Sequence, residues 1–256
     1  SKTDLRDWGF KSEDTIRIIL SRLKQHKDRA LMTSIAKSSG GSCLRPGLRI
    51  GPDGQYKLLC KLSSQESSSM SSSTRAATAT TTTTTRSEVW KARNESNDEQ
   101  LVIKFFKSHK LRDDEVKRLS DVPSACVLRP LSLVDVGSVL FGFTMEFGES
   151  LLDVIMQPLV DWEYKRKLLN KAALAVAEGL HNRFFVWTDC KPQNFIVTGA
   201  RGAESVRMID LESCVKEGEH PTASTLTYSA PEIICGEAVT TKADSWSFGV
   251  TVFQVL

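Results

Sequence analysis

The spacing of hydrophobic and polar residues changes near the middle of the chain. The first half carries short apolar or alternating runs separated by polar turns, a pattern that predicts β-strands. We expect strands at 48–50, 55–62, 88–93, 101–107, 126–134 and 138–147, with a short helix at 111–119. The turn signal Pro52-Asp53-Gly54 separates the first two strands.

Beyond Gly148 the apolar residues follow a helical period. Helices are expected at 151–156 and 161–182. In the longer helix, the residues spaced to share one buried face are Leu169, Ala173, Val176 and Leu180. A β-rich half followed by a helical half predicts an α+β fold with two lobes.

Two segments fall outside this simple division. Residues 12–32 have the pattern of an amphipathic helix with a basic outer face, and we favour a solvated helix packed on a domain over a membrane-surface or partner helix. The tract from Ser63 to Thr85 holds eight Ser and eight Thr and has no periodicity. Such a tract cannot bury enough apolar surface to offset its ordering entropy, so we expect a disordered insertion.

The composition is that of a folded protein, since 40% of the 256 residues are hydrophobic and 25% are charged. The 34 basic and 31 acidic residues are too evenly balanced to favour a nucleic-acid partner. The sequence contains no apolar run of about 18 residues, so no membrane span is expected. Six cysteines without CxxC spacing predict neither a zinc site nor a disulfide framework. Because the chain begins at Ser1 without an apolar leader, we expect a piece of a longer protein.

The densest group of chemically active side chains lies at 189–194, after the long helix and before an apolar run. This segment presents Asp189, Lys191 and Asn194. Phosphoryl transfer uses such a set: a carboxylate orients the attacking hydroxyl, a cation neutralises charge, and an amide oxygen helps to hold Mg²⁺. The alternative is that Asp189 and Asn194 merely cap turns.

Charged residues beside apolar runs suggest further parts of a site. Asp210 directly follows a strand-like run and suits a metal ligand. Lys104 lies inside an apolar strand, where a lone lysine is costly without a partner. Glu115 on the following helix is the first candidate, with Asp113 and Asp114 as alternatives. A plain buried ion pair is the competing interpretation.

These residues, in their order along the chain, resemble the motifs of the eukaryotic protein kinase family. Those that match its nucleotide, metal and catalytic positions are Lys104, Glu115, Asp189, Lys191, Asn194 and Asp210. Those that match its gatekeeper and hinge, whose backbone would meet adenine, are Met145, Glu146, Phe147 and Gly148. The stretch 225–232 resembles the substrate-binding segment, and 244–249 resembles the start of the large central helix. Lys191 together with Thr225 is the pattern of serine/threonine kinases.

The resemblance implies a bilobal fold, ATP and Mg²⁺ as cofactors, and a protein substrate or regulatory protein as partner. Residues 1–54 would form a helical extension and linker, 55–148 a β-rich N-terminal lobe with the Ser/Thr-rich insertion at 63–86, and 149–256 an α-helical C-terminal lobe. We expect this lobe to be truncated within its central helix, which would expose Phe248, Val252, Phe253 or their neighbours.

The chain departs from the family pattern in its phosphate loop and catalytic loop. No glycine occurs between Gly54 and Gly137, so the glycine-rich phosphate loop is absent and the insertion stands in its place. Trp187 and Thr188 replace His-Arg before Asp189. Trp187 can still pack in a core, but Thr188 cannot pair with a phosphate as arginine does. We therefore expect activity without phosphorylation of the activation loop.

The metal motif departs as well, because Asp210 is followed by Leu211 and Glu212 instead of Phe-Gly. Leu211 keeps an apolar position. Glu212 either restricts movement of the segment or captures a cation, or else it points to solvent. His109 and His181 are interpreted as incidental surface or helix-end residues.

Two functions from different classes remain open. The first is a divergent serine/threonine kinase, and the alternative is a pseudokinase that acts as a nucleotide-binding or allosteric scaffold. At a finer level the chain resembles the rhoptry kinases and pseudokinases of apicomplexan parasites, which are secreted into the host cell. A generic cytoplasmic kinase is the competing interpretation.

Overall fold

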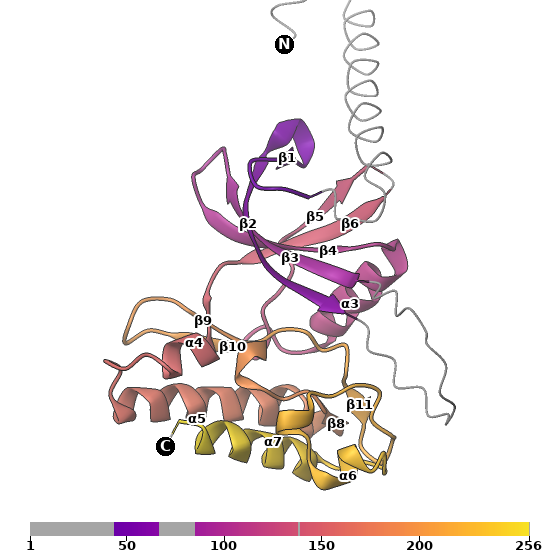
Figure 1. The fold of residues 1–256 in the computed structure, drawn as a ribbon, viewed down its shortest axis with the longest axis vertical. Coiled ribbons are helices and arrows are strands. Elements are labelled where there is room, and N and C mark those ends of the chain that lie inside the picture. Colours follow the sequence, from indigo (N-terminus) through magenta and orange to yellow (C-terminus); the bar gives the residue numbers. More distant parts are fainter. Residues whose placement is uncertain (1–43, 67–84, 138, 256) are drawn as a thin grey trace, which may run out of the picture.

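The computed structural model describes residues 44–66, 85–137 and 139–255, and Figure 1 shows them as two lobes, one above the other. The upper, N-terminal lobe contains a six-stranded sheet and helix α3, and the lower, C-terminal lobe is mainly helical. The predicted α+β, bilobal architecture is confirmed. The predicted helix at 12–32 and most of the Ser/Thr-rich tract lie outside the described residues.

Neighbouring strands of the upper sheet all pair antiparallel, in the order β1-β2-β3-β4-β6-β5. The strands are β1 (Arg49–Ile50), β2 (Tyr56–Glu66), β3 (Thr85–Asn94), β4 (Gln100–Phe106), β5 (Ser132–Val136) and β6 (Leu140–Glu146). The predicted turn forms a 3₁₀ helix, η1 (Pro52–Gly54), between β1 and β2. Each strand predicted for this half overlaps an observed one.

Strand β4 directs its lysine toward the junction of the lobes. Ile103 and Phe105 belong to the core of the upper lobe, whereas Val102 and Phe106 belong to the core shared with the lower lobe. Side chains alternate across a strand, so Lys104 shares the face of Val102 and Phe106. That face lies against helix α3 (His109–Asp121).

Three predicted strand ends differ from the structure by three residues or more. β2 continues to Glu66 and β3 begins at Thr85, so strand pairing reaches into both ends of the tract predicted as an insertion. Ladder hydrogen bonds join main-chain atoms, and polar side chains do not prevent them. The strand expected at 126–134 begins only at Ser132, and before it a single bridge joins Val127 to Met208. Its apolar character reflects burial in the core shared by both lobes.

The lower lobe combines helices with short strands. Its helices are α4 (Leu151–Ile155), α5 (Trp162–Gly179), α6 (Pro231–Ile234) and α7 (Thr241–Phe253), with the 3₁₀ helices η2 (His181–Arg183), η3 (Pro192–Asn194) and η4 (Leu226–Tyr228). Its strands are β7 (Glu149–Ser150), β8 (Phe185–Val186), β9 (Phe195–Thr198), β10 (Ser205–Met208) and β11 (Val215–Lys216).

Helix α5 begins where Asp161 caps it, because the carboxylate accepts a hydrogen bond from the backbone N of Tyr164 at 2.8 Å. Its buried residues are Leu168, Leu169, Ala172, Ala175, Val176 and Gly179. The buried face therefore contains the predicted Leu169 and Val176. Ala173 is only half-buried, so the face is rotated slightly from the prediction.

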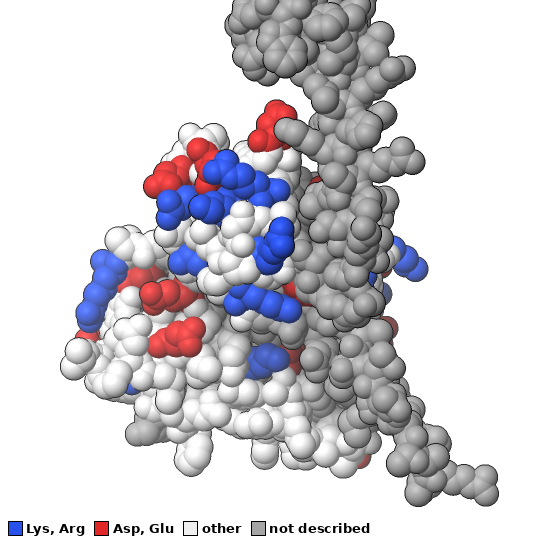
Figure 2. Space-filling model, turned by 45° about the horizontal axis from the view of Figure 1, so that its top comes forward, with Lys and Arg blue, Asp and Glu red and all other residues white. Residues whose placement is uncertain are grey.

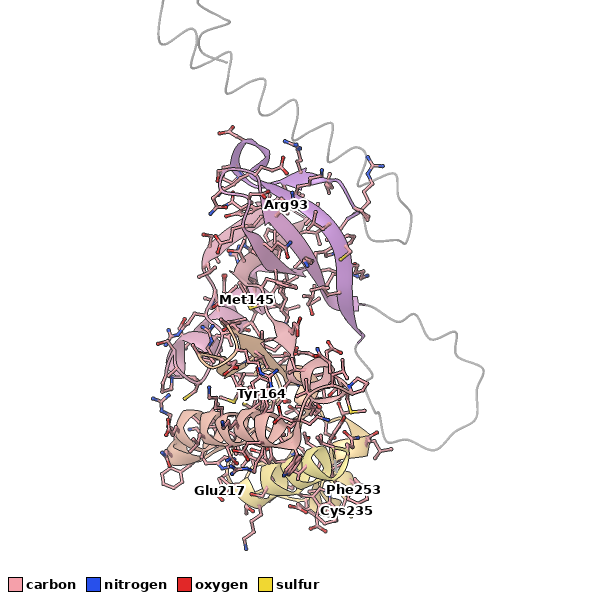
Figure 3. The ribbon with its side chains drawn as sticks, turned by 90° about the vertical axis from the view of Figure 1, so that its left-hand side faces the viewer. Arg93, Met145, Tyr164, Glu217, Cys235 and Phe253 are labelled. Carbon is pink, nitrogen blue, oxygen red and sulfur yellow. The ribbon has the colours of Figure 1, made fainter. Side chains whose placement is uncertain are left out.

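Helix α7 turns a polar face inward, with Asp244, Ser247 and Thr251 buried. The expected exposure is right for Phe253, which is 79% exposed and lies at the lower end of the molecule in Figure 3. Phe248 and Val252 are half-buried because they pack against the shared core, so among the three named residues the exposure falls on Phe253. None of the described helices is long and apolar enough to span a bilayer.

Gly148, between the lobes, is predicted to tolerate no larger side chain. A Cβ atom there would lie 2.5 Å from both Ile196 Cγ2 and the carbonyl oxygen of Val197. We expect Gly148→Ala to lower the free energy of unfolding by about 1–3 kcal/mol, measured by denaturant titration. The matched control is Gly249→Ala in α7, where a Cβ meets nothing within 4 Å. The control should be neutral or stabilising, and equal losses in both variants would contradict the prediction.

Candidate active site

A buried lysine and two carboxylates connect β4, α3 and the segment 210–232, here called the activation segment. Lys104 Nζ lies 3.1 Å from Glu115 Oε1 and 3.3 Å from Asp210 Oδ1. Burial lowers the pKa of Lys104, but Asp210 and Glu115 outweigh burial and raise this pKa above its ordinary value. Lys104 is therefore a fixed positive charge, and Glu115 is its partner on α3.

The segment 187–194, here called the catalytic loop after the family motif that it resembles, forms a hydrogen-bonded network with Thr225. Asp189 Oδ1 accepts a hydrogen bond from Thr225 Oγ1 at 2.6 Å, and Asp189 Oδ2 accepts one from Lys191 Nζ at 2.8 Å. Lys191 Nζ also lies 2.7 Å from Thr225 Oγ1. The structure thus brings three of the residues predicted from the sequence into direct contact, although Thr225 lies 36 residues beyond Asp189.

Asn194 and Asp210 suit a magnesium ion by their chemistry. Asn194 Nδ2 donates to the backbone O of Asp189 at 3.0 Å and to its Oδ2 at 3.2 Å, which leaves the amide oxygen of Asn194 to meet a cation. The backbone N of Ile209 donates to the backbone O of Asn194 at 2.9 Å, so the two positions are tied together.

Within the described ranges, no group of three or more His, Cys, Asp or Glu side chains could hold a metal ion. The amide of Asn194 and the carboxylate of Asp210 still fit Mg²⁺, because this ion usually takes only one or two protein ligands. Water and phosphate oxygens fill its other coordination positions. The residues present therefore fit an ion that binds together with a nucleotide.

The predicted hinge residues lie where the two lobes meet, and Figure 3 labels Met145 at this junction. Met145 is buried on β6 opposite Val102 of β4. The Phe147 ring lies beneath Lys91 of β3, with 4.0 Å between Nζ and the ring centroid. Gly148 packs directly on β9, as the close Cβ contacts above require. The hinge is therefore bounded above by β3 and below by β9.

An ion pair joins the hinge to the lower lobe. Arg207 of β10 bonds Glu146 through one terminal nitrogen, which also lies 2.6 Å from Thr198 Oγ1. Nothing in the local sequence around Arg207 indicated this contact, because its partner lies 61 residues earlier.

Trp187 occupies the core, as predicted. Its side chain is fully buried and meets Phe195 edge to face, with 5.2 Å between ring centroids. Its Nε1 donates to the backbone O of Asp210 at 3.0 Å. The indole thus links the catalytic loop to the metal motif.

Two residues of the site have left-handed backbones. Thr188 has φ 50° and Asp210 has φ 62°, and a β-branched residue seldom adopts this region. Asp244 of α7 holds the loop in this shape, because its carboxylate accepts bonds from the backbone N of Trp187 at 2.8 Å and of Thr188 at 3.1 Å. His181 lies at a helix end, as expected, because it begins η2 directly after α5, and its Nε2 also lies 2.9 Å from Asp244 Oδ2.

The Thr188 side chain bridges two parts of the activation segment. Its Oγ1 lies 2.9 Å from the backbone O of Ser213 and 2.9 Å from that of Ala223. The side chain is buried, and Ser213 Oγ in turn donates to the backbone O of Trp187 at 2.6 Å. Hydroxyl groups therefore join the loop around Thr188 to the activation segment, at a position where the family pattern has an arginine instead of a threonine.

The residues after Asp210 differ in their surroundings. Leu211 is buried in the shared core, as expected. Glu212 is half-buried. It contributes to a cavity of about 290 Å³, whose other lining residues include Ser87, Phe106, Lys110, Glu115 and Arg118.

Both signs of charge occur together on the upper lobe, as Figure 2 shows. Arg49 pairs with Glu95, and Arg93 lies 3.1 Å from Asp98. These basic side chains are thus partly neutralised by acidic neighbours.

The sequence of residues 84–256, which is more than half of the chain, matches the family model of the protein kinase domain. The chain therefore belongs to the protein kinase family.

Individual relatives are serine/threonine kinases and a cyclic-nucleotide-dependent kinase. Serine/threonine-protein kinase ArnS of Sulfolobus acidocaldarius is 32% identical over 135 residues, covering 44% of this chain and 22% of that protein. The cGMP-dependent protein kinase of Eimeria tenella is 30% identical over 112 residues, covering 43% of this chain and 11% of that protein. The proto-oncogene serine/threonine-protein kinase mos of Mus musculus is 34% identical over 94 residues, covering 33% of this chain and 27% of that protein. The matched region is thus less than a third of each relative.

The Thr188 hydroxyl is predicted to order the activation segment. Thr188→Val keeps the shape of the side chain but leaves two carbonyl oxygens without their hydroxyl partner. We expect a destabilisation of about 1–3 kcal/mol, with faster hydrogen exchange at 213–223 than in the parent protein. Thr222→Val is the control, because Thr222 is exposed in the same segment.

The same contacts predict that phosphatase treatment leaves any phosphoryl transfer by the parent protein unchanged. Loss of transfer after treatment, or unaltered exchange in Thr188→Val, would contradict the role given to the hydroxyl.

Proposed function

We propose that this chain is a serine/threonine kinase domain that transfers the γ-phosphoryl group of ATP to a hydroxyl group of a protein. The network around Asp189 carries the proposal. Its carboxylate accepts bonds from Lys191, Asn194 and Thr225. A carboxylate that only capped a turn would require neither a lysine nor a hydroxyl from a distant segment.

In this proposal Asp189 orients the attacking hydroxyl and accepts its proton. Lys191 neutralises negative charge that develops on the transferring group, since its Nζ is already held beside Asp189. Thr225 contacts both side chains and fixes the distance between them. These three residues thus define where a substrate hydroxyl would lie.

Membership of the kinase family implies use of ATP and a divalent cation, and the proposal assigns them to particular residues. Lys104 contacts the phosphates while Glu115 holds Lys104 in place. Asn194 and Asp210 provide oxygens for Mg²⁺, which neutralises phosphate charge when bound. The hinge residues beside adenine are Met145, Glu146, Phe147 and Gly148.

Loss of the Asp189 carboxylate tests the catalytic assignment. We expect Asp189→Asn to reduce transfer of labelled γ-phosphate to a generic protein substrate by about a hundredfold or more, because a positioned base typically contributes this much. The control is Asp98→Asn in an exposed turn of the upper lobe, which should retain full activity. A full-length protein that is inert with both Mg²⁺ and Mn²⁺ would refute the proposal.

A second candidate function is a pseudokinase scaffold, which binds partners without catalysis. The observation that favours it is the absence of glycine between Gly54 and Gly137, since glycine lets backbone N–H groups approach phosphate oxygens closely. The Glu212 carboxylate two residues after Asp210 adds negative charge near the metal motif.

Thermal shift with ATP and Mg²⁺ separates a nucleotide-using protein from a scaffold that binds no nucleotide. A nucleotide-using protein should gain about 2.7 kcal/mol of stability at a ligand concentration one hundred times Kd. Lys104→Met should abolish a metal-dependent shift, whereas Lys117→Met on the exposed side of α3 should preserve it. No shift in the parent protein would favour the scaffold.

The finer assignment to rhoptry-type kinases stays a prediction. It is supported by the Thr-Asp catalytic loop and the Ser/Thr-rich tract in the sequence. Localisation of the full-length protein checks it, because a rhoptry-type protein is secreted into a host cell and a generic kinase stays in the cytoplasm.

A further inference from the structure

The helix that carries Glu115 docks on the upper sheet through charged as well as apolar side chains. The buried residues of α3 are Arg112, Glu115 and Leu119, spaced so that they lie along one face. Leu111 and Val116 add partial burial. Apolar contact is non-directional, so these leucine and valine contacts define the position of the helix less sharply than hydrogen bonds do.

Arg112 makes directed contacts with two strands at the edge of the sheet. One terminal nitrogen bonds Asp135 of β5, and the guanidinium carbon lies 6.0 Å from the ring centroid of Phe141 on β6. On the helix itself, Nε bonds Asp113 at 2.9 Å and the other terminal nitrogen lies 3.1 Å from His109 Nδ1. The guanidinium group therefore has partners on both strands and on its own helix. His109 is the exposed first residue of α3, as expected for a surface or helix-end residue, and in addition it contacts Arg112.

We infer that Arg112 is a positioning residue for the nucleotide site: through Asp135 it fixes α3 on the sheet and so holds Glu115 within reach of Lys104. Glu115 follows Arg112 by three residues, which is an axial rise of about 4.5 Å. A guanidinium group with bonds in fixed directions leaves the helix little freedom to slide or rotate. The inference rests on the proposed function, because that function assigns Lys104 to the phosphates.

The exposure of the two partners makes the inference testable. The Arg112 side chain is 7% exposed, whereas that of Asp135 is 43% exposed. Removing Arg112 therefore leaves Asp135 partly in water, and the effect is not dominated by an unpaired buried charge. Methionine at position 112 keeps an apolar stem of similar length but cannot bond Asp135.

The test compares Arg112→Met with Lys117→Met in the full chain, since Lys117 is exposed on the same helix. We expect Arg112→Met to raise the KM for ATP about tenfold with little change in the KM for the protein substrate. General destabilisation would instead lower kcat by reducing the folded fraction. Arg112→Lys keeps the charge without the planar fork and should give an intermediate KM.

Hydrogen exchange provides a readout that needs no catalysis. Arg112→Met should accelerate exchange across 109–121 while α5 stays protected, and Lys117→Met should leave both unchanged. Asp135→Ala should produce the same pattern, and the double variant should add little to either single change, because both remove one contact.

The outcomes separate the two claims. A parent protein that neither binds ATP nor transfers phosphate refutes the proposed function, while the exchange data still decide the role of Arg112. The inference is overturned if Arg112→Met shows the same hydrogen exchange across 109–121 as Lys117→Met. It is also overturned if the two variants have the same KM for ATP. Fully additive effects of Arg112→Met and Asp135→Ala would overturn it as well.

Discussion

The positive charge of one buried lysine constrains much of this structure. An ammonium group removed from water is tolerated only where carboxylates surround it. At Lys104 these come from Glu115 on α3 and from Asp210, which lies 106 residues further along the chain. Strand, helix and activation segment are therefore held together by one charge. The left-handed backbone of Asp210 is tolerated because this ion pair and the Trp187 indole both hold it.

Local patterns in the sequence predicted the parts of the site that stand out from their surroundings. Lys104 interrupts an apolar strand, and Asp189, Lys191 and Asn194 are crowded into six residues, so each group could be recognised without a structure. The change in the spacing of apolar residues, from a strand pattern to a helical one near Gly148, predicted the two lobes. The end of β2 was predicted too early and the start of β3 too late, because the polar sequence there is typical of an insertion. Backbone hydrogen bonds between strands do not depend on side-chain polarity.

The remaining contacts could not be found in this way because they join residues distant in sequence. Arg112 has the appearance of a surface arginine on a polar helix until β5 is placed beside it. Thr188 was recognised as a missing arginine, but its hydroxyl bonds to Ser213 and Ala223 require the folded activation segment. At both positions the contacts that matter are made with segments far along the chain, so the local sequence does not reveal them.

The contacts of Asp244 also affect the order in which parts of the chain fold. Its carboxylate holds Trp187 and Thr188, which precede it by 57 and 56 residues. Closing so long a loop costs chain entropy before any contact compensates for it. On the ribosome the catalytic loop emerges well before α7 has been made. The strained backbone at Thr188 consequently lacks the Asp244 contacts during early synthesis, and the shape of this loop should be among the last features that a newly made chain acquires.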